Sequence, residues 1–487
     1  MVNRTLAAWV QALVVVIIGV SVGVVAAASA HDDSLAGIDW QPCSGEPVLD
    51  CAVFEVPLDH DDPDGPTIEL VLVRRRADDP SRRIGTLLWN PGGPGASAID
   101  MASADDHLAG LGERFDIISM DPRGIGYSTP VACDNHLDDV ITLDPLPGDA
   151  AAREELDEAW RTFARSCAER SGDLLAHVGT ADVVEDMEHI RVALGEEQLN
   201  FVGFSYGTYL GAAYADAYPE RVRAFVLDGA VDPEQAGFGL IAVQAEGLER
   251  AINAFLDDCA QTPDCPLNPD PHARYDAFVE RLAVEPVASS DPTRTVGLGE
   301  FAVAIGNSAS AGEVIWPLFA TAIADAIAGD GDALLLLADQ SSGRNPDGSY
   351  KPVIGAQAAV ACLDPLFPTT PNETEAVEEH IRANAPRARA AIEFSWRVCD
   401  EWAVPARPAP RFEAHGAAPI LVIGTTLDPA TPYEWSVALA EQLESGVLLT
   451  AEGTTHTSFT SDECVDEIVR EYMFNLNLPA SGARCRS

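Results

Sequence analysis

The sequence is poor in positive charge. Among its 487 residues, Lys and Arg together number 30 against 77 Asp and Glu, which gives a formal net charge of −47 at pH 7. Lys351 is the only lysine in the sequence. A chain this acidic is repelled by nucleic acids and by anionic membrane surfaces, so neither is expected as a partner. The charge indicates a solvated surface, part of whose negative field is suited to attract cationic substrate amino termini.

The sequence also lacks internal repeats, low-complexity runs and any C-x-x-C spacing among its ten cysteines. Without that spacing a zinc-like metal site is not expected. In an exported protein, ten cysteines indicate five disulfides. The simplest pairing is sequential, since it closes short local loops: Cys43 with Cys51, Cys133 with Cys167, Cys259 with Cys265, Cys362 with Cys399, and Cys464 with Cys485.

The N-terminus has the features of an export signal. Arg4 supplies the charged end, residues 6–25 are apolar, and Ala28-Ser29-Ala30 fits a small-residue cleavage site before His31. We therefore interpret residues 1–30 as a signal peptide and expect a secreted or cell-envelope protein. The alternative is that the apolar run remains as an uncleaved anchor, the one case in which a membrane would be a partner.

A G-x-S-x-G motif is the most informative stretch of the chain. Gly203-Phe204-Ser205-Tyr206-Gly207 follows an apolar strand, residues 199–202, and precedes a helical run, residues 208–217. A serine between two glycines at a strand-to-helix turn is typical of a nucleophile held in a tight, strained conformation. The motif predicts Ser205 as nucleophile and the amide of Tyr206 as an oxyanion donor.

The partners of a serine nucleophile are expected in the order serine, acid, histidine. Asp428 follows a buried strand at residues 419–424, and His456 follows the last strand at residues 447–450. These positions predict His456 as general base and Asp428 as the carboxylate that orients it. Asp228, which ends another strand, is a rival acid that we rank second.

Two further loops follow strands of the predicted sheet. Asn90-Pro91-Gly92-Gly93-Pro94-Gly95 comes after the strand at residues 86–89, and its glycines allow a bare backbone amide to approach a substrate carbonyl. We expect the second oxyanion donor to be Gly93, or Gly92 if the loop is shifted by one residue. Arg123, in the loop after the strand at residues 115–120, is expected to be structural rather than catalytic.

Strands and helices alternate up to Asp228, as a mostly parallel sheet requires. The helix at residues 181–194, with Thr180 as its expected N-cap, belongs to this part. Helix-like runs then dominate until the sheet resumes near Pro419. We interpret residues 31–232 and 412–487 as the two parts of one α/β core, and residues 233–411 as an inserted, mainly helical cap.

These motifs together resemble the secreted tripeptidyl aminopeptidases of actinomycetes, relatives of proline iminopeptidase. The resemblance is carried by N-P-G-G-P-G, D-P-R-G-I-G-Y-S, G-F-S-Y-G-T-Y-L-G and the D-P-A-T-P to T-T-H-T pair, which occur in this order. Mycobacterial cell-envelope serine hydrolases look similar too. The resemblance implies an α/β-hydrolase fold. Two departures are Pro91, where proline iminopeptidases have histidine, and Thr455, where glycine is common.

The expected activity is that of a serine exopeptidase that releases short peptides, tripeptides by the resemblance, from free amino termini of peptides or proteins through an acyl-enzyme. It needs no cofactor or metal. Such an enzyme must bind an ammonium group at a fixed distance from Ser205, and a carboxylate in the cap is the simplest device. Asp364 is the first candidate and Glu246 the second. Two alternatives remain: a carboxylesterase or lipase that uses the same triad, and a non-catalytic envelope-binding protein.

Overall fold

The computed structural model describes residues 37–102, 108–133, 136–364, 366–368, 370–394 and 396–486. The predicted signal peptide lies outside the described residues.

Ten strands form one sheet in the order β1-β2-β3-β5-β4-β6-β7-β10-β11-β12. β1 to β3 pair antiparallel, β3 also runs antiparallel to β5, and every pair from β5 to β12 is parallel. The strands are β1 (Gln41–Cys43), β2 (Glu46–Pro57), β3 (Thr67–Arg75), β4 (Gly85–Asn90), β5 (Phe115–Met120), β6 (Leu199–Phe204), β7 (Val222–Asp228), β10 (Ile420–Thr425), β11 (Gly446–Glu452) and β12 (Arg484–Arg486).

The central strands are short and apolar because helices cover both of their faces. Every residue of β4, β6 and β10 is buried, as parallel strands between two helical layers require. The covering helices include α4 (Thr180–Ala193), α5 (Tyr206–Ala217), α14 (Tyr433–Gln442) and α15 (Glu463–Asn475). The strands around the site occur where the sequence predicts them, so the α/β fold is confirmed.

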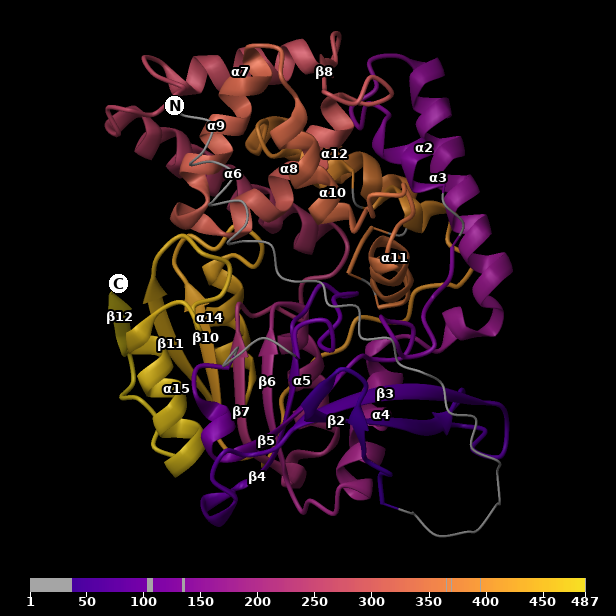
Figure 1. Cartoon of the computed structure of the whole chain (residues 1–487), viewed down its shortest axis with the longest axis vertical. Helices are drawn as coiled ribbons and strands as arrows, with labels where there is room; N and C mark the ends of the chain where they lie inside the picture. The colour runs from indigo at the N-terminus through magenta and orange to yellow at the C-terminus, as the bar shows by residue number, and fades with distance from the viewer. Residues whose placement is uncertain are drawn as a thin grey trace.

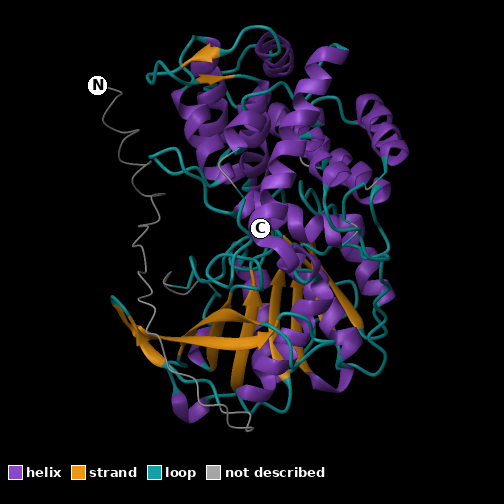
Figure 2. Ribbon diagram, turned by 90° about the vertical axis from the view of Figure 1, so that its right-hand side faces the viewer, coloured by secondary structure: helices purple, strands orange, loops and turns teal. Residues whose placement is uncertain are grey.

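A second, helical layer lies beyond the ends toward which the central strands point (Figures 1 and 2). Between β7 and β10 the described chain forms helices and one small hairpin of β8 (Val287–Ala288) and β9 (Thr295–Val296). These helices are α6 (Phe238–Gln261), α7 (Pro271–Leu282), α8 (Leu298–Ser310), α9 (Trp316–Ile327), α10 (Asp332–Ser342), α11 (Val353–Leu363), α12 (Pro371–Asn384) and α13 (Arg389–Glu393). The extent of the cap as a unit, residues 233–411, stays a prediction.

Helices from the first part of the core also lie beside the cap. α2 (Leu137–Ile141) and α3 (Ala150–Ser171) stand next to the helical layer in Figure 1. The ring centroid of Trp160 in α3 lies 5.4 Å from that of Phe394 in the cap. Arg153 Nη1, also in α3, lies 3.1 Å from Glu378 Oε1 in α12. The cap is therefore packed against an earlier helix as well as against the sheet.

Arg123 has the structural role that the sequence predicts. The side chain is fully buried, and its guanidinium donates to both carboxylate oxygens of Asp186 at 2.7 Å. It also donates to the carbonyl oxygens of Pro57, Leu58 and His177. A buried charge is tolerated when it is paired and fully hydrogen-bonded, and this one joins three separate segments of the chain.

The prediction that Thr180 is the N-cap of α4 is wrong. Gly179 is the cap residue and Thr180 is the first residue of the helix. The backbone N–H of Thr180 donates to Asp364 Oδ2 at 2.8 Å. A carboxylate from a distant part of the chain therefore takes the place of the local cap, which no local pattern could reveal.

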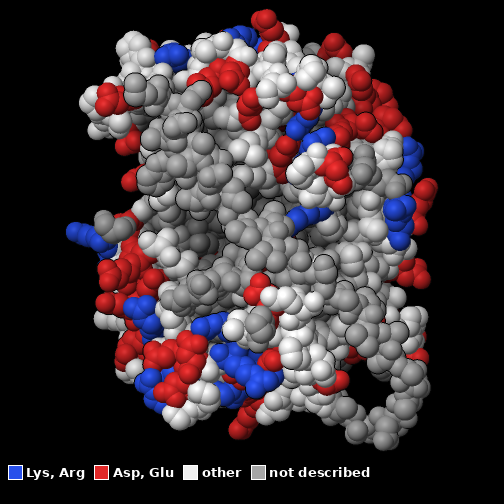
Figure 3. Space-filling model, viewed as in Figure 1, with Lys and Arg blue, Asp and Glu red and all other residues white. Residues whose placement is uncertain are grey.

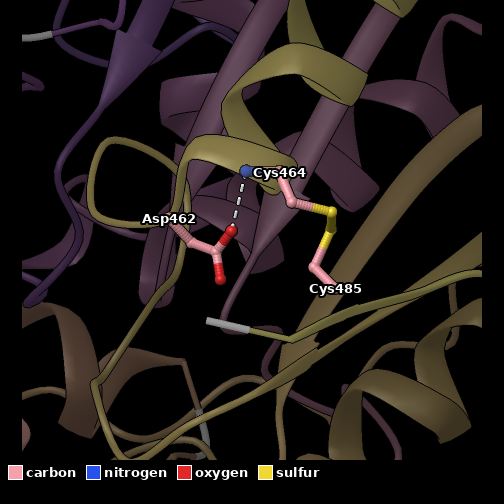
Figure 4. Close-up of side chains that lie close together, drawn as sticks. All are labelled: Asp462, Cys464 and Cys485. Atoms are coloured by element: carbon pink, nitrogen blue, oxygen red, sulfur yellow. Dashed lines mark hydrogen bonds between the residues drawn. A yellow bond between two sulfur atoms is a disulfide. The ribbon is translucent and has the colours of Figure 1, made fainter.

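The five disulfides are paired as the sequence predicts: Cys43–Cys51, Cys133–Cys167, Cys259–Cys265, Cys362–Cys399 and Cys464–Cys485. At the last pair, Asp462 accepts a hydrogen bond from the backbone N–H of Cys464 at the start of α15 (Figure 4). Both sulfurs there belong to the disulfide and not to thiolates, so this group of three is a helix cap beside a cross-link rather than a metal site.

Acidic side chains spread over the face drawn in Figure 3, while Lys and Arg gather in its lower part, where β4 and β5 lie. Arg83 is one arginine that is paired, with Asp116 at 2.7 Å and with Glu196 at 2.9 Å. None of the helices in the described part of the chain combines the length and apolar character needed to cross a membrane.

Replacing both Cys133 and Cys167 by serine should lower the free energy of unfolding by about 3–4 kcal/mol, because the cross-link restricts a long loop of the unfolded chain. Denaturant unfolding measures the loss. The matched control is the Cys43–Cys51 pair, which closes a shorter loop and should cost less. Peptide mapping without reduction should find the five local links, and free thiols or a link from Cys43 to Cys485 would contradict the pairing.

Candidate active site

Ser205 occupies the strained turn between β6 and α5. Its φ is +55°, in the left-handed region that side chains other than glycine rarely adopt. The flanking glycines are required by close contacts: a Cβ on Gly203 would lie 2.3 Å from the carbonyl oxygen of Gly207. A Cβ on Gly207 would lie 2.7 Å from the carbonyl oxygen of Asn90. The turn therefore needs small residues on both sides of the serine.

The glycine loop after β4 lies directly against this turn. A Cβ on Gly92 would stand 2.6 Å from the Phe204 carbonyl oxygen and 2.8 Å from the Ser205 Cβ, so only glycine fits. The N–H of Gly92 donates to the Asn90 side chain at 2.9 Å. Because that amide is engaged, the geometry favours Gly93 over Gly92 as the oxyanion donor.

Tyr206, the other proposed donor, is the first residue of α5. Its backbone N–H therefore belongs to the unpaired first turn of a helix, where the positive end of the helix dipole also favours an oxyanion. Its side chain is buried, and its hydroxyl lies 2.6 Å from Thr180 Oγ1. This contact holds the first turn of α5 against α4.

Asp428 and His456 meet in the loops after β10 and β11. The Nδ1 atom of His456 lies 2.9 Å from both carboxylate oxygens of Asp428. Asp428 is buried and also accepts from the backbone N–H groups of Ala430 and Thr431 at 2.9 and 2.8 Å. A carboxylate held in this way fixes the orientation of the ring and leaves Nε2 as the nitrogen that can receive a proton.

Asp228, the rival acid, has a different environment. Its Oδ2 accepts from the backbone N–H groups of Ser458 at 2.9 Å and Phe459 at 2.7 Å, just beyond His456. Its backbone carbonyl accepts from the N–H of Ser205 at 2.9 Å. Burial raises the pKa of Asp228 to about 7. Asp228 therefore connects the nucleophile turn to the histidine loop and makes no hydrogen bond to the His456 ring among the described contacts.

Ser205 and His456 lie on the wall of one cavity of about 790 Å³, a size that suits small peptides and comparable ligands. The loops of the core that carry Gly93, Ser205 and His456 form one side. Cap residues form the other side: Gln244 and Leu248 of α6, Gln340 and Ser341 of α10, Val353 and Gln357 of α11, and Ala391 and Ile392 of α13. The cap thus covers the predicted nucleophile.

Opposing effects act on the pKa of His456. Burial lowers it, whereas the charge of Asp428 and the hydrogen bond to it raise it, and the net shift is upward from 6.5. The protonated, imidazolium form of His456 is thereby stabilised. A general base with this pKa is neutral, and so active, only at higher pH than an isolated histidine.

Neither residue predicted to bind the substrate amino terminus lines the described cavity. Asp364 is buried and accepts from both the N–H and the hydroxyl of Thr180, at 2.8 and 2.6 Å. Burial raises the pKa of Asp364 to about 6. Glu246 is half exposed on α6 and lies 2.8 Å from His380 Nε2. Both carboxylates have other partners, so the geometry favours structural roles for them.

The charged residues that do line the cavity are not among those predicted from the sequence. Asp100 and Lys351 are the only Asp, Glu, Lys or Arg on its described wall, and the Lys351 Nζ lies 2.6 Å from Asp100 Oδ2. The available signals were the place of Asp100 soon after the glycine loop and the fact that Lys351 is the single lysine. Neither signal says that the two residues meet, because they are far apart in the sequence.

A serine on a strained turn, a buried carboxylate bonded to histidine and a glycine-rich loop, all at one edge of a parallel sheet, define a serine hydrolase of the α/β-hydrolase fold. Comparison with family models agrees: the model described as "alpha/beta hydrolase fold" matches residues 85–311, and the model described as "TAP-like protein" matches residues 387–485. The chain belongs to the TAP-like serine hydrolases, the family of the tripeptidyl aminopeptidases.

Several curated relatives span nearly the whole chain. The serine protease Hip1 of Mycobacterium tuberculosis is 35% identical, over 92% of this chain and 91% of the relative. Carboxylesterase B of the same organism is 38% identical, over 89% of this chain and 86% of the relative. The tripeptidyl aminopeptidase of Streptomyces coelicolor is 28% identical, over 94% of this chain and 88% of the relative. The chain is thus similar to both peptidases and an esterase.

Substitution of Ser205 or His456 by alanine should reduce kcat by about 10⁴-fold or more, because acylation needs both a nucleophile and a general base, the roles predicted for them. Asp428→Asn should be comparably severe, since it removes the charge that orients and stabilises His456. Asp228→Asn should cost about tenfold or less, because the amide oxygen can still accept from the Ser458 and Phe459 amides. Steady-state kinetics decide between the two acids: an inactive Asp228→Asn beside an active Asp428→Asn would overturn the assignment.

The kcat/KM should fall as the pH is lowered through the pKa of His456, which lies above 6.5, because protonation removes the general base. A pH profile of kcat/KM measures this limb. Burial also raises the pKa of Asp228, to about 7, so Asp228→Asn is the control. The limb should persist in that variant, and its disappearance would assign the titration to Asp228 instead.

Proposed function

We propose that this protein is an exported serine exopeptidase that releases short peptides, tripeptides by family resemblance, from free amino termini of peptides or proteins. Ser205 attacks the scissile carbonyl, and His456 takes its proton and returns it to the leaving amine. Asp428 orients the ring and stabilises the imidazolium. The backbone N–H groups of Tyr206 and Gly93 bind the oxyanion. None of these steps requires a metal or a cofactor.

The observation that carries the proposal is the covered cavity beside Ser205. Core loops and cap helices face each other across it. This arrangement favours a substrate whose chain end enters the cavity. It disfavours a substrate that would have to bind across Ser205 through the middle of a folded chain. The names of two relatives, a serine protease and a tripeptidyl aminopeptidase, support a peptidase. Five disulfides support a place outside the cytoplasm.

A carboxylesterase of the cell envelope is the second candidate. The relative named carboxylesterase B is 38% identical over 89% of this chain, and the same triad and oxyanion donors would cleave an ester. The two functions differ in what the cavity recognises. A peptidase that acts on chain ends must distinguish a charged amino terminus from a neutral one, whereas an esterase has no such need.

The deciding experiment compares tripeptide amides with a free amino group, the same peptides with an acetylated amino group, and a simple acyl ester. The free peptides should be cleaved about 10- to 100-fold more efficiently than the blocked ones, the scale of one charge-assisted hydrogen bond left unpaired. The Ser205→Ala variant is the control for contaminating activity. Equal cleavage of free and blocked peptides, together with faster turnover of the ester, would favour the esterase.

A further inference from the structure

The wall of the catalytic cavity carries one carboxylate and one ammonium in its described part, and the two are paired. Asp100 comes from the loop that continues the glycine motif after β4, and Lys351 comes from the cap, just before α11. Their charged atoms are 2.6 Å apart. About two fifths of each side chain is exposed, at 37% for Asp100 and 40% for Lys351. The pair is therefore accessible from the cavity and weakly bound, since exposed ion pairs contribute little net free energy.

Asp100 is held in place by its own side of the cavity. The hydroxyl of Tyr127 donates to Asp100 Oδ1 at 3.0 Å, and the backbone N–H of Asp100 donates to Ser97 Oγ at 3.1 Å. Burial, together with the charge of Asp100, raises the pKa of Tyr127 to about 12, so this hydroxyl keeps its proton. The carboxylate thus remains oriented whether or not Lys351 is beside it.

A buried acid beneath the loop fixes these groups relative to the oxyanion donors. Asp121 accepts from Ser97 Oγ at 2.9 and 2.8 Å, from the N–H of Ile99 at 3.2 Å and from the N–H of Tyr127 at 3.0 Å. The same short loop includes Gly93. Asp100 therefore stands at a constant separation from the place where the scissile carbonyl binds, as an enzyme that measures length from a chain end requires.

Lys351 provides the chemical group that such a site would recognise. Its ammonium carries the same charge and the same N–H donors as a peptide amino terminus. The backbone N–H of Lys351 donates to the Gly343 carbonyl at 2.9 Å, which fixes the base of the side chain and leaves its long stem free to turn. Exchange of one ammonium for another at Asp100 leaves the carboxylate paired before and after the peptide enters.

We propose that Asp100 binds the amino-terminal ammonium of the substrate, and that Lys351 takes this position when no substrate is bound and yields it when a peptide enters. This inference rests on the proposed exopeptidase function and identifies the residue that recognises the chain end. It replaces Asp364 and Glu246 in that role. Lys351 then competes with the substrate for Asp100. A substrate that carries an ammonium can replace Lys351 with little loss of binding free energy, whereas a neutral end cannot.

The test breaks the same ion pair from either side. The quantity measured is the ratio of kcat/KM for a free tripeptide amide to that for its acetylated form. Asp100→Asn should lower this ratio about tenfold or more, because the ammonium loses its partner. Lys351→Gln should raise the ratio about threefold or more, mainly through a lower KM for the free peptide, because the competitor is gone. Asp64→Asn, which removes an exposed acid in the turn between β2 and β3, should leave the ratio unchanged.

A purely structural ion pair would give a different result, because loss of either partner would then change the ratio in the same direction or not at all. Either result would overturn the inference. A ratio near one in the wild type would remove the proposed function and this inference together. A high wild-type ratio that Asp100→Asn preserves would leave the exopeptidase function standing and refute only the assignment of Asp100. Thermal unfolding of each variant checks that the fold is intact.

Discussion

The site depends on the way Asp228 joins its two halves. The backbone carbonyl of this residue accepts from the N–H of Ser205, and its carboxylate accepts from the backbone N–H groups of Ser458 and Phe459. The next residue, Gly229, has no Cβ, and one placed there would lie 3.2 Å from the His456 ring. Nucleophile and base come from opposite sides of a long helical insertion, so their alignment is set by the end of β7 and not by the cap.

Much of this arrangement could be predicted because its signals are local. The G-x-S-x-G turn, the glycine loop and the apolar strands each depend on neighbouring residues, and the order of serine, acid and histidine selects Asp428 and His456. Asp228 could be recognised only as a strand-end acid. Its partners lie 230 and 231 residues away in the chain, and they are backbone amides, which leave no mark on the sequence. The choice of Asp428 as the residue that contacts His456 therefore had to rest on chain order.

The recognition residues could not be predicted for the same physical reason. Asp364 lies two residues after Cys362, and the Cys362–Cys399 disulfide restrains its loop. Rigidity, however, does not fix direction: the carboxylate caps α4 through Thr180 instead of lining the cavity. The contact between Asp100 and Lys351 joins residues 251 positions apart. Only the packing of cap on core brings them together, and local patterns carry no information about it.

One helix connects the recognition of substrate with the chemistry. Lys351 lies just before α11 and faces Asp100, while Asp364 ends the helix and binds Thr180, whose hydroxyl contacts the Tyr206 side chain. Between these ends, a Cβ on Gly95 would lie 2.8 Å from the Val353 carbonyl, so the helix packs directly on the glycine loop. α11 therefore contacts the glycine loop near its start and, through Asp364 and Thr180, the first turn of α5 at its end. Changes of substrate within this family are then expected to act through α11 and its flanks, because the triad itself is fixed independently by β7.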